Sequence, residues 1–180
     1  MCGIVGYLGY RDIISVLIVG LERLSYRGYD SAGISVISDD ELSVWKKPGK
    51  VHVLAKQLES LNIQANIGIG HTRWATHGIA NEVNAHPHYD SKKRFSIVHN
   101  GIIENYLSIK SELVNEGFLF RSQTDSEAIV HLIDKYYQGS LLEAVQMAVS
   151  RLEGSFAICA ISTMDSDRMI VCRKNSPIII

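Results

Sequence analysis

The strongest constraint on the fold is the grouping of strand-like and helix-like segments along this chain of 180 residues. Strand-like segments lie near both ends of the chain, and helix-like segments lie between and after them. A series of βαβ units would instead alternate strands and helices regularly and form a parallel sheet. The grouping therefore predicts a layered α+β fold, and the length suits a single domain over residues 1–180.

The first half of the chain gives clear periodic signals. A short apolar run punctuated by glycines at 3, 6 and 9 is typical of a buried strand, and Asp12 stands where the N-cap of the next helix is expected. Two strand-like segments flank Asp39, Asp40 and Glu41, which predicts a hairpin. We expect strands at 3–8, 32–38 and 42–46, and helices at 12–26 and 51–61.

In the second half, two strand-like segments, IGIGHTR and FSIVHNG, bracket a polar, histidine-rich loop within residues 68–101. Two helices are predicted by capping boxes, in which Thr124 precedes Glu127 and Ser140 precedes Glu143. Further strands are expected at 156–162 and 169–173. The apolar run 177–180 suggests a chain cut from a longer one, or an edge covered by a partner.

Charge and hydropathy exclude several classes of function. The net charge is −1 and charged residues make up 21% of the chain, without the basic stripe that nucleic-acid binding requires. No apolar stretch approaches the roughly 18 residues of a spanning helix, and no signal peptide is recognisable. Three cysteines without a secretory signal favour the cytoplasm, with Cys159 and Cys172 as core residues.

Cys2 has a chemically unusual position, because removal of Met1 would give it a free α-amine beside its thiol. A thiol with an ordinary pKa of about 8.5 is only slightly ionised at neutral pH and needs a base nearby. An α-amine, with a pKa of roughly 7.7 to 8, can accept that proton. Cys2 could therefore supply both the nucleophile and the base. Its position alone, however, favours the interpretation that it is simply a small residue at the start of the chain.

If Cys2 attacks an amide, the site also needs donors for an oxyanion and an anchor for the substrate. Asn100 and Gly101, at the end of a strand, could supply such donors, although Asn-Gly is also a common turn. Arg73 could hold a carboxylate with its planar fork. Asp125 could pair with a substrate ammonium or simply favour the first turn of a helix. Whether Arg73 and Asp125 meet stays open.

A metal or nucleotide site is not expected. Five of the seven histidines lie between residues 71 and 99, but their spacing fits neither a zinc-finger pair nor an HExxH helix. Neither of the common glycine-rich phosphate loops occurs. Trp74 could be a core aromatic residue or a residue of a lid over the site.

Six strings occur in order along the chain: MCGIVGY, YRGYDSAG, GHTRWATHG, NAHPH, HNGIIEN and TDSE. Together they closely resemble the glutaminase domain of the glucosamine-6-phosphate synthases, the isomerising glutamine:fructose-6-phosphate amidotransferases. The resemblance spans essentially all 180 residues. It implies a class II glutamine amidotransferase with the N-terminal-nucleophile hydrolase fold, a four-layer αββα sandwich of two stacked antiparallel sheets between helices.

The resemblance also implies the chemistry and the site. Glutamine would be hydrolysed to glutamate and ammonia through a γ-glutamyl thioester on Cys2, whose own α-amine is the base. Asn100 and Gly101 match the oxyanion hole, and no metal or other cofactor is implied. The remaining matches are Arg73, Thr76 and His77 around the glutamine α-carboxylate, Asp125 at its ammonium, and Trp74 at the loop that helps gate ammonia.

The chain departs from the family pattern in two ways. Ser126 stands where threonine is more usual, which keeps the hydroxyl group, and no sugar-phosphate isomerase domain follows Ile180. In the family that domain uses the ammonia to convert fructose 6-phosphate to glucosamine 6-phosphate, in hexosamine biosynthesis. We therefore expect residues 1–180 to be one domain of a longer, cytoplasmic and homo-oligomeric enzyme.

Two alternatives remain. The glutaminase domains of amidophosphoribosyltransferase and asparagine synthetase also begin with cysteine, but RWATHG, NAHPH and YRGYDSAG favour the sugar amidotransferases. The other alternative is a non-catalytic glutamine-binding module. Such a module would have no chemical reason to keep Cys2, Arg73, Asn100 and Asp125 together.

Overall fold

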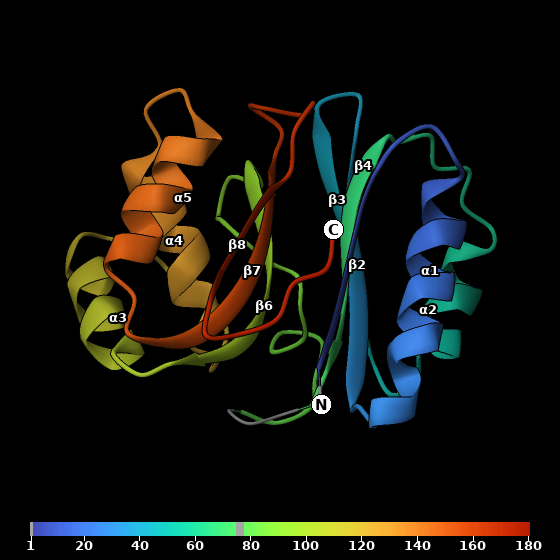
Figure 1. Ribbon diagram of the computed structural model, residues 1–180, viewed down its shortest axis with the longest axis horizontal. Coiled ribbons are helices and arrows are strands. Elements are labelled where there is room, and N and C mark those ends of the chain that lie inside the picture. Colours follow the sequence, from blue (N-terminus) through green and yellow to red (C-terminus); the bar gives the residue numbers. More distant parts are fainter. Residues whose placement is uncertain (1, 75–77) are drawn as a thin grey trace.

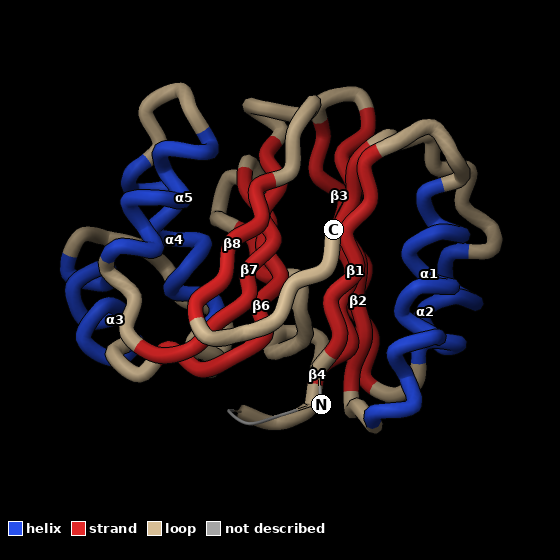
Figure 2. The backbone as a smooth tube through the Cα atoms, in the orientation of Figure 1, coloured by secondary structure: helices blue, strands red, loops and turns tan. Residues whose placement is uncertain are grey.

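The computed structural model describes residues 2–74 and 78–180 (Figure 1). Within these ranges the chain forms two antiparallel four-stranded sheets that lie face to face, with helices on the outer side of each. The layers run helix, sheet, sheet, helix, as the tube in Figure 2 also shows. The predicted αββα sandwich is therefore confirmed.

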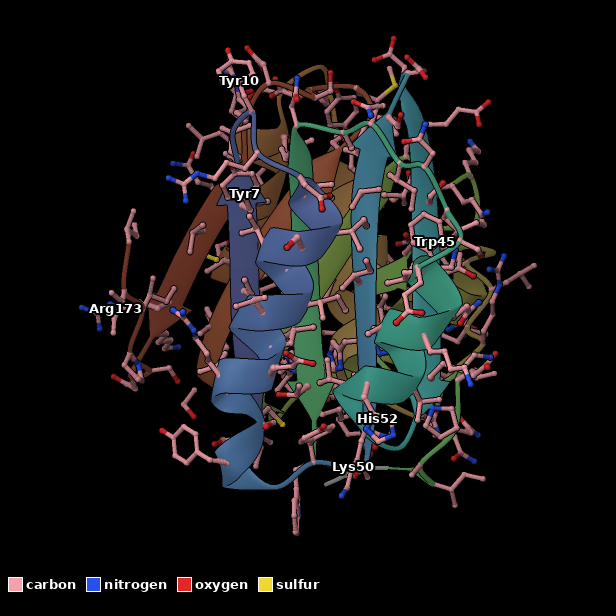
Figure 3. The ribbon with its side chains drawn as sticks, turned by 90° about the vertical axis from the view of Figure 1, so that its right-hand side faces the viewer. Tyr7, Tyr10, Trp45, Lys50, His52 and Arg173 are labelled. Atoms are coloured by element: carbon pink, nitrogen blue, oxygen red, sulfur yellow. The ribbon has the colours of Figure 1, made fainter. Side chains whose placement is uncertain are left out.

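The first sheet has the strand order β1-β4-β2-β3. Its strands, all antiparallel to their neighbours, are β1 (Gly3–Leu8), β4 (Ile67–Arg73), β2 (Ser31–Ser38) and β3 (Glu41–Pro48). β2 and β3 form the predicted hairpin, which turns at Asp39 and Asp40 with φ of 50° and 60°. The outer face is covered by α1 (Ile13–Leu24), continued by the short 3₁₀ turn η1 (Ser25–Arg27), and α2 (Val51–Leu58), which lie side by side in Figure 3.

The second sheet has the strand order β5-β6-β7-β8. Its strands are β5 (His88–Tyr89), β6 (Phe95–Ile103), β7 (Gly154–Ser162) and β8 (Ile170–Lys174). Helices α4 (Ser126–Tyr136) and α5 (Leu141–Ser150) cover its outer face, and α3 (Tyr106–Asn115) packs against α4.

Separate apolar clusters hold the four layers together. One, around Leu17 and Ile34, lies between the first sheet and its helices, and another, around Ile97 and Ile129, lies between the second sheet and its helices. A third joins the two sheets through Ile67, Ile69, Val98 and further residues of both. Cys159 belongs to this inter-sheet cluster, as predicted for a core residue, whereas Cys172 is only half-buried and packs against the outer cluster of the second sheet.

Strand periodicity selects the side chains that enter the space between the sheets. In β4, Ile67 and Ile69 face the second sheet, so the alternation of a strand directs His71 and Arg73 to the same side. In β6, Ser96 and Val98 face the first sheet, and Asn100 follows them. In both strands the polar residues follow the apolar ones, and His71 and Asn100 meet beyond the apolar inter-sheet cluster.

Some predicted details of the helices are wrong. Thr124 does not cap α4: Asp125 is at the N-cap without a side-chain capping bond, and the Thr124 hydroxyl instead meets His88 Nε2 at 2.9 Å. Asp12 is at the N-cap of α1 but makes no capping bond either. Ser140 caps α5 as predicted, since its hydroxyl accepts a bond from the Glu143 backbone N–H.

The remaining differences concern element boundaries. α2 ends at Leu58 rather than at residue 61, and neither α3 nor the two-residue strand β5 was predicted. Asn100 and Gly101 lie within β6, not at its end, because pairing with β7 continues to Ile103. Every helix in the described ranges is too short or too polar to cross a membrane.

Candidate active site

Cys2 lies just before β1, at the end of the first sheet where β4 finishes. The backbone N–H of Trp74 donates to Cys2 Sγ at 3.1 Å, and the Trp74 carbonyl oxygen lies 3.7 Å from the same sulfur. The first residue after β4 therefore holds the sulfur of the candidate nucleophile.

One cavity of about 890 Å³ joins the candidate site residues that the structure describes. Its lining includes the predicted catalytic residues and the predicted substrate-binding and gating residues. These are Cys2, Arg73, Trp74, Asn100, Gly101 and Asp125. Residues 176–180 also line it, and Figure 2 shows the loop after β8 running from the second sheet towards the first. Thr76 and His77 lie outside the described residues.

Arg73 and Asp125 come from different layers of the fold, the first sheet and the start of α4, and border the same cavity. Arg73 ends β4 and is 4% exposed, while Asp125 precedes α4 and is 5% exposed. Burial lowers the pKa of the Arg73 guanidinium, and the charges of Asp30, Cys2 and Asp125 oppose that effect. Asp125 accepts a bond at 2.8 Å from the backbone N–H of Ile103, which fixes its carboxylate beside β6. The cavity thus presents one cationic and one anionic group to a ligand.

Asn100 places a donor of the second sheet near Cys2, and Gly101 follows it on the lining of the cavity. Asn100 Nδ2 donates to the Cys2 carbonyl oxygen at 3.4 Å, and Asn100 Oδ1 lies 2.8 Å from His71 Nε2. Gly101 has a φ of +135°, and a Cβ there would overlap the Ser155 carbonyl oxygen of β7. Glycine is therefore required at this point of the strand.

Four buried histidines, His71, His86, His88 and His99, lie close to the candidate site, and two of them, His86 and His99, line the cavity. The ring of His86 lies 4.2 Å from that of His71 and 4.6 Å from that of His88, and His99 Nδ1 bonds the Ser126 hydroxyl at 2.8 Å. Burial lowers the pKa of His71 to about 3 and that of His99 to about 4, so these rings are neutral. In residues 2–74 and 78–180 no three histidine, cysteine or acidic side chains are arranged to hold a metal ion.

Sequence reasoning missed two polar residues in the surroundings of Arg73, namely Asn84 and Lys46. Asn84 is 1% exposed, and its Nδ2 donates to the Ile79 carbonyl oxygen at 3.0 Å. Arg73 Nη1 reaches the same oxygen at 3.4 Å. Lys46 donates to the carbonyl oxygens of Val83 and Ala85, and burial lowers its pKa to about 8. These contacts join residues of different segments, so no local sequence pattern predicts them.

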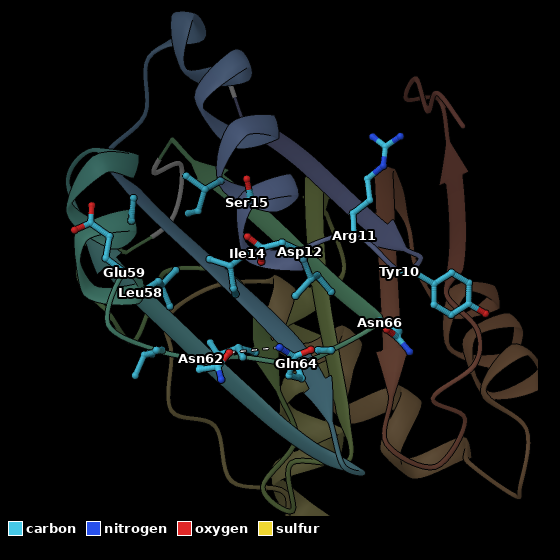
Figure 4. Close-up of a pocket in the computed structure, with 16 residues that line it drawn as sticks. Tyr10, Arg11, Asp12, Ile14, Ser15, Leu58, Glu59, Asn62, Gln64 and Asn66 are labelled. Atoms are coloured by element: carbon cyan, nitrogen blue, oxygen red, sulfur yellow. Dashed lines mark hydrogen bonds between the residues drawn. The ribbon is translucent and has the colours of Figure 1, made fainter.

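A second cavity, of about 570 Å³, lies on the other side of the first sheet (Figure 4). It is formed by the start of α1 and the segment 58–66, with Tyr10, Arg11 and Asn66 at its rim. It contains none of the predicted site residues. The predicted site residues that the structure describes lie on the larger cavity instead.

Two stacked antiparallel sheets between helices, with a cysteine leading into a strand at the inter-sheet cavity, define the class of N-terminal-nucleophile hydrolases. Residues 71–178 match the model of the glutamine amidotransferase domain family. The chain belongs to this family.

Relatives with high identity have one name in common. The chain is 54% identical over 181 residues to the glutamine--fructose-6-phosphate aminotransferase [isomerizing] of Aquifex aeolicus (strain VF5). It is 48% identical over 182 residues to the protein of the same name from Pyrococcus horikoshii. Each alignment covers 100% of this chain and 30% of the relative, so the chain spans less than a third of their length.

Solved structures support the fold. The glutamine phosphoribosylpyrophosphate amidotransferase from B. subtilis, complexed with ADP and GMP, superposes with a TM-score of 0.82 at 25% identity. The match covers 96% of this chain and 37% of that one. A glutamine aminotransferase class-II domain protein from Silicibacter pomeroyi has a TM-score of 0.58 at 14% identity, over 99% of this chain and 79% of that one, which concerns the fold alone.

Proposed function

We propose that this chain hydrolyses L-glutamine to glutamate and ammonia through a γ-glutamyl thioester on Cys2. The observation that supports this most is the shared cavity, in which Cys2 is accompanied by Arg73, Asp125 and Asn100. A guanidinium, a carboxylate and an amide donor are the complements of the α-carboxylate, the α-ammonium and the developing oxyanion of glutamine. Family membership supports the same substrate.

The reaction begins when the Cys2 sulfur attacks the side-chain amide carbon of glutamine. Removal of Met1 leaves a free α-amine on Cys2, and this amine takes the thiol proton. The oxyanion accepts hydrogen bonds from Asn100 Nδ2 and the backbone N–H of Gly101. The protonated amine then gives its proton to the leaving nitrogen, so that ammonia departs and the thioester remains. Water attacks the thioester, with the same amine as base, and glutamate is released.

Substrate binding uses the two buried charged residues that line the cavity. Arg73 holds the α-carboxylate, and Asp125 pairs with the α-ammonium. Thr76 and His77 complete the carboxylate site, in line with the GHTRWATHG string. The indole of Trp74 is 53% exposed, which suits a residue that gates the passage of ammonia.

In the full-length protein we propose that ammonia passes to a second, sugar-phosphate isomerase domain. There it would convert fructose 6-phosphate to glucosamine 6-phosphate for hexosamine biosynthesis, in a cytoplasmic homo-oligomer. The names of the relatives support this, and the 30% of their length that this chain matches leaves room for such a domain.

An amidophosphoribosyltransferase-like domain is the nearest alternative, because that fold superposes well. The sequence identity favours the sugar amidotransferases, at 54% against 25%. A non-catalytic glutamine-binding module would lack a reason for a donor at 3.1 Å from Cys2 Sγ. Measured turnover decides between an enzyme and such a module.

The test is the release of glutamate from glutamine by protein whose Met1 has been removed, compared with its Cys2→Ala variant. Wild-type protein should release glutamate and ammonia in equal amounts, and Cys2→Ala should release neither while it still binds glutamine. Cys172→Ala is the matched control, because this half-buried thiol lies outside the cavity and its loss should leave turnover unchanged. Turnover by Cys2→Ala would contradict the proposal.

A further inference from the structure

His71 of β4 and Asn100 of β6 form a hydrogen bond between the two sheets. The distance from His71 Nε2 to Asn100 Oδ1 is 2.8 Å, and His71 is 1% exposed. The bond lies beyond the apolar inter-sheet cluster, at the end of the sheets where Cys2 is placed. It links the first sheet, which carries Cys2, to the candidate oxyanion donor of the second.

The contacts of Asn100 define which way its amide group points. Its nitrogen Nδ2 faces the carbonyl oxygen of Cys2, which can only accept a hydrogen bond. Its oxygen Oδ1 therefore faces His71, and because Oδ1 is also only an acceptor, His71 Nε2 must carry the proton. With the other tautomer, two acceptors would face each other, and the amide would turn over and direct its oxygen towards Cys2.

The surroundings of His71 keep the ring in place and uncharged. Burial is the main reason that its pKa is lowered to about 3, so one ring nitrogen carries a proton and the other does not. The ring of His86 packs at 4.2 Å with a tilt of 37°. Gly33 of β2 permits this packing, since a Cβ there would overlap the carbonyl oxygen of His86.

We propose that His71 is a positioning residue, which orients the amide of Asn100 so that its N–H groups face the oxyanion formed at Cys2. This inference rests on the proposed function and deepens it. His71 does not touch the substrate and acts through Asn100 alone. It therefore contributes to the transition state of thioester formation and leaves the binding of glutamine unchanged.

A double-mutant cycle of His71→Leu and Asn100→Ala tests this dependence. Loss of one oxyanion donor typically lowers kcat about 100- to 1,000-fold. We expect His71→Leu to lower kcat roughly 10- to 100-fold, because the donor is misdirected rather than lost, with KM within about twofold of wild type. In the Asn100→Ala background His71→Leu should have no further effect. An equal loss in both backgrounds, or an unchanged kcat in the single variant, would overturn the proposal.

Two further variants separate positioning from packing. His71→Gln places an amide nitrogen near the position of the ring Nε2, and it should recover most of the lost kcat. His131→Leu removes an imidazole that is 2% exposed and lies on α4, outside the cavity, so its kcat should stay within about twofold of wild type. A His71→Gln variant as slow as His71→Leu, or an equally slow His131→Leu, would argue against a specific bond to Asn100.

The tautomer of His71 provides a test that does not require activity or a folded variant. Nitrogen-15 NMR of the wild-type ring should show a neutral imidazole protonated at Nε2, whereas protonation at Nδ1 would overturn the proposal. The two proposals fail differently. Inactive wild-type protein or active Cys2→Ala protein would contradict glutamine hydrolysis, whereas a normal kcat in His71→Leu with an inactive Cys2→Ala protein would contradict only the role of His71.

Discussion

Cys2 contacts the rest of the site mainly through backbone atoms. Its sulfur meets the N–H and the carbonyl oxygen of Trp74, and its own carbonyl oxygen accepts a bond from Asn100. The two contacts of the sulfur depend on the backbone at the end of β4 and not on the indole ring of Trp74. The surroundings of the candidate nucleophile thus come from the backbone after β4 and one side chain of β6, whereas the recognition of substrate that we propose depends on the side chain of Arg73.

Arg73→Lys tests that recognition at a single residue. A lysine keeps the positive charge but cannot form two parallel hydrogen bonds with a carboxylate, so substrate binding should weaken. We expect KM for glutamine to rise about tenfold, which corresponds to about 1.4 kcal/mol, while kcat changes little. Steady-state kinetics measures both. Arg168→Lys, at a 57% exposed surface ion pair, is the control, and an unchanged KM in Arg73→Lys would remove Arg73 from this role.

At the scale of the strands, β6 and β7 come unusually close at Gly101. The register pairs Gly101 with Phe156, and the missing side chain leaves space for the Ser155 carbonyl oxygen. Gly117 also has a positive φ, of +93°, but a Cβ there would meet nothing within 4 Å. A substitution at Gly117 therefore introduces backbone strain alone, whereas the same substitution at Gly101 adds a clash with β7.

Gly101→Ala should destabilise the fold more than Gly117→Ala. Both variants place alanine at a positive φ, but only the first forces a methyl group into the backbone of β7. Overpacking of this kind typically costs about 1 to 3 kcal/mol beyond the strain itself. Urea unfolding of the two variants measures the difference in the free energy of unfolding. Equal losses would show that β6 and β7 can separate locally without cost.

The elements that could be predicted from the sequence are those with a strong local pattern. β1 was predicted at its observed bounds, and the β2–β3 hairpin was found from the polar residues at its turn. α3 was missed because only Ile109 and Leu113 of this helix are buried, which leaves little periodic signal. The cap of α4 was misassigned because Thr124 bonds a histidine of another element, which no local pattern reveals.

Some of the site residues could also be predicted from the sequence, because they lie in strong local motifs. The strings around Cys2, Arg73, Asn100 and Asp125 marked them as candidates, and the structure places all of these on one cavity. The supports of the site were not predicted, because they depend on contacts between sheets and loops. His71 and Asn84 are the main examples. The alternation of β4 was a usable signal for His71, since it shares a strand face with Ile67 and Ile69.

At the scale of the whole molecule, the buried histidines make the fold sensitive to acid. Burial lowers the pKa of His71, His86, His88 and His99 in the folded state, with the charges of Arg73 and Lys46 adding to the effect and those of Asp125 and Glu127 opposing it. In the unfolded chain these rings titrate near pH 6.5. Their contribution to stability is therefore complete above pH 6.5 and is lost as the pH falls towards the folded-state values.

The free energy of unfolding should fall by roughly 3 to 4 kcal/mol between pH 6.5 and pH 5.5, since each such histidine contributes about 1 kcal/mol over that interval. Urea unfolding at a series of pH values measures this slope. His88→Gln keeps a donor for Thr124 but removes one titrating ring, so it should reduce the loss by about 1 kcal/mol. A free energy of unfolding that stays constant across this interval would contradict the account.

The central claim is that Cys2 supplies both nucleophile and base, and its most direct test changes only the α-amine. The protein is prepared with a short N-terminal extension that a site-specific protease removes to leave Cys2 first, and glutamate release is measured before and after cleavage. An extended chain has an amide nitrogen on Cys2, which cannot accept the thiol proton. We predict that glutaminase activity is at background before cleavage and appears in proportion to the Cys2 amine set free. Equal activity in the extended and the cleaved protein would contradict the account.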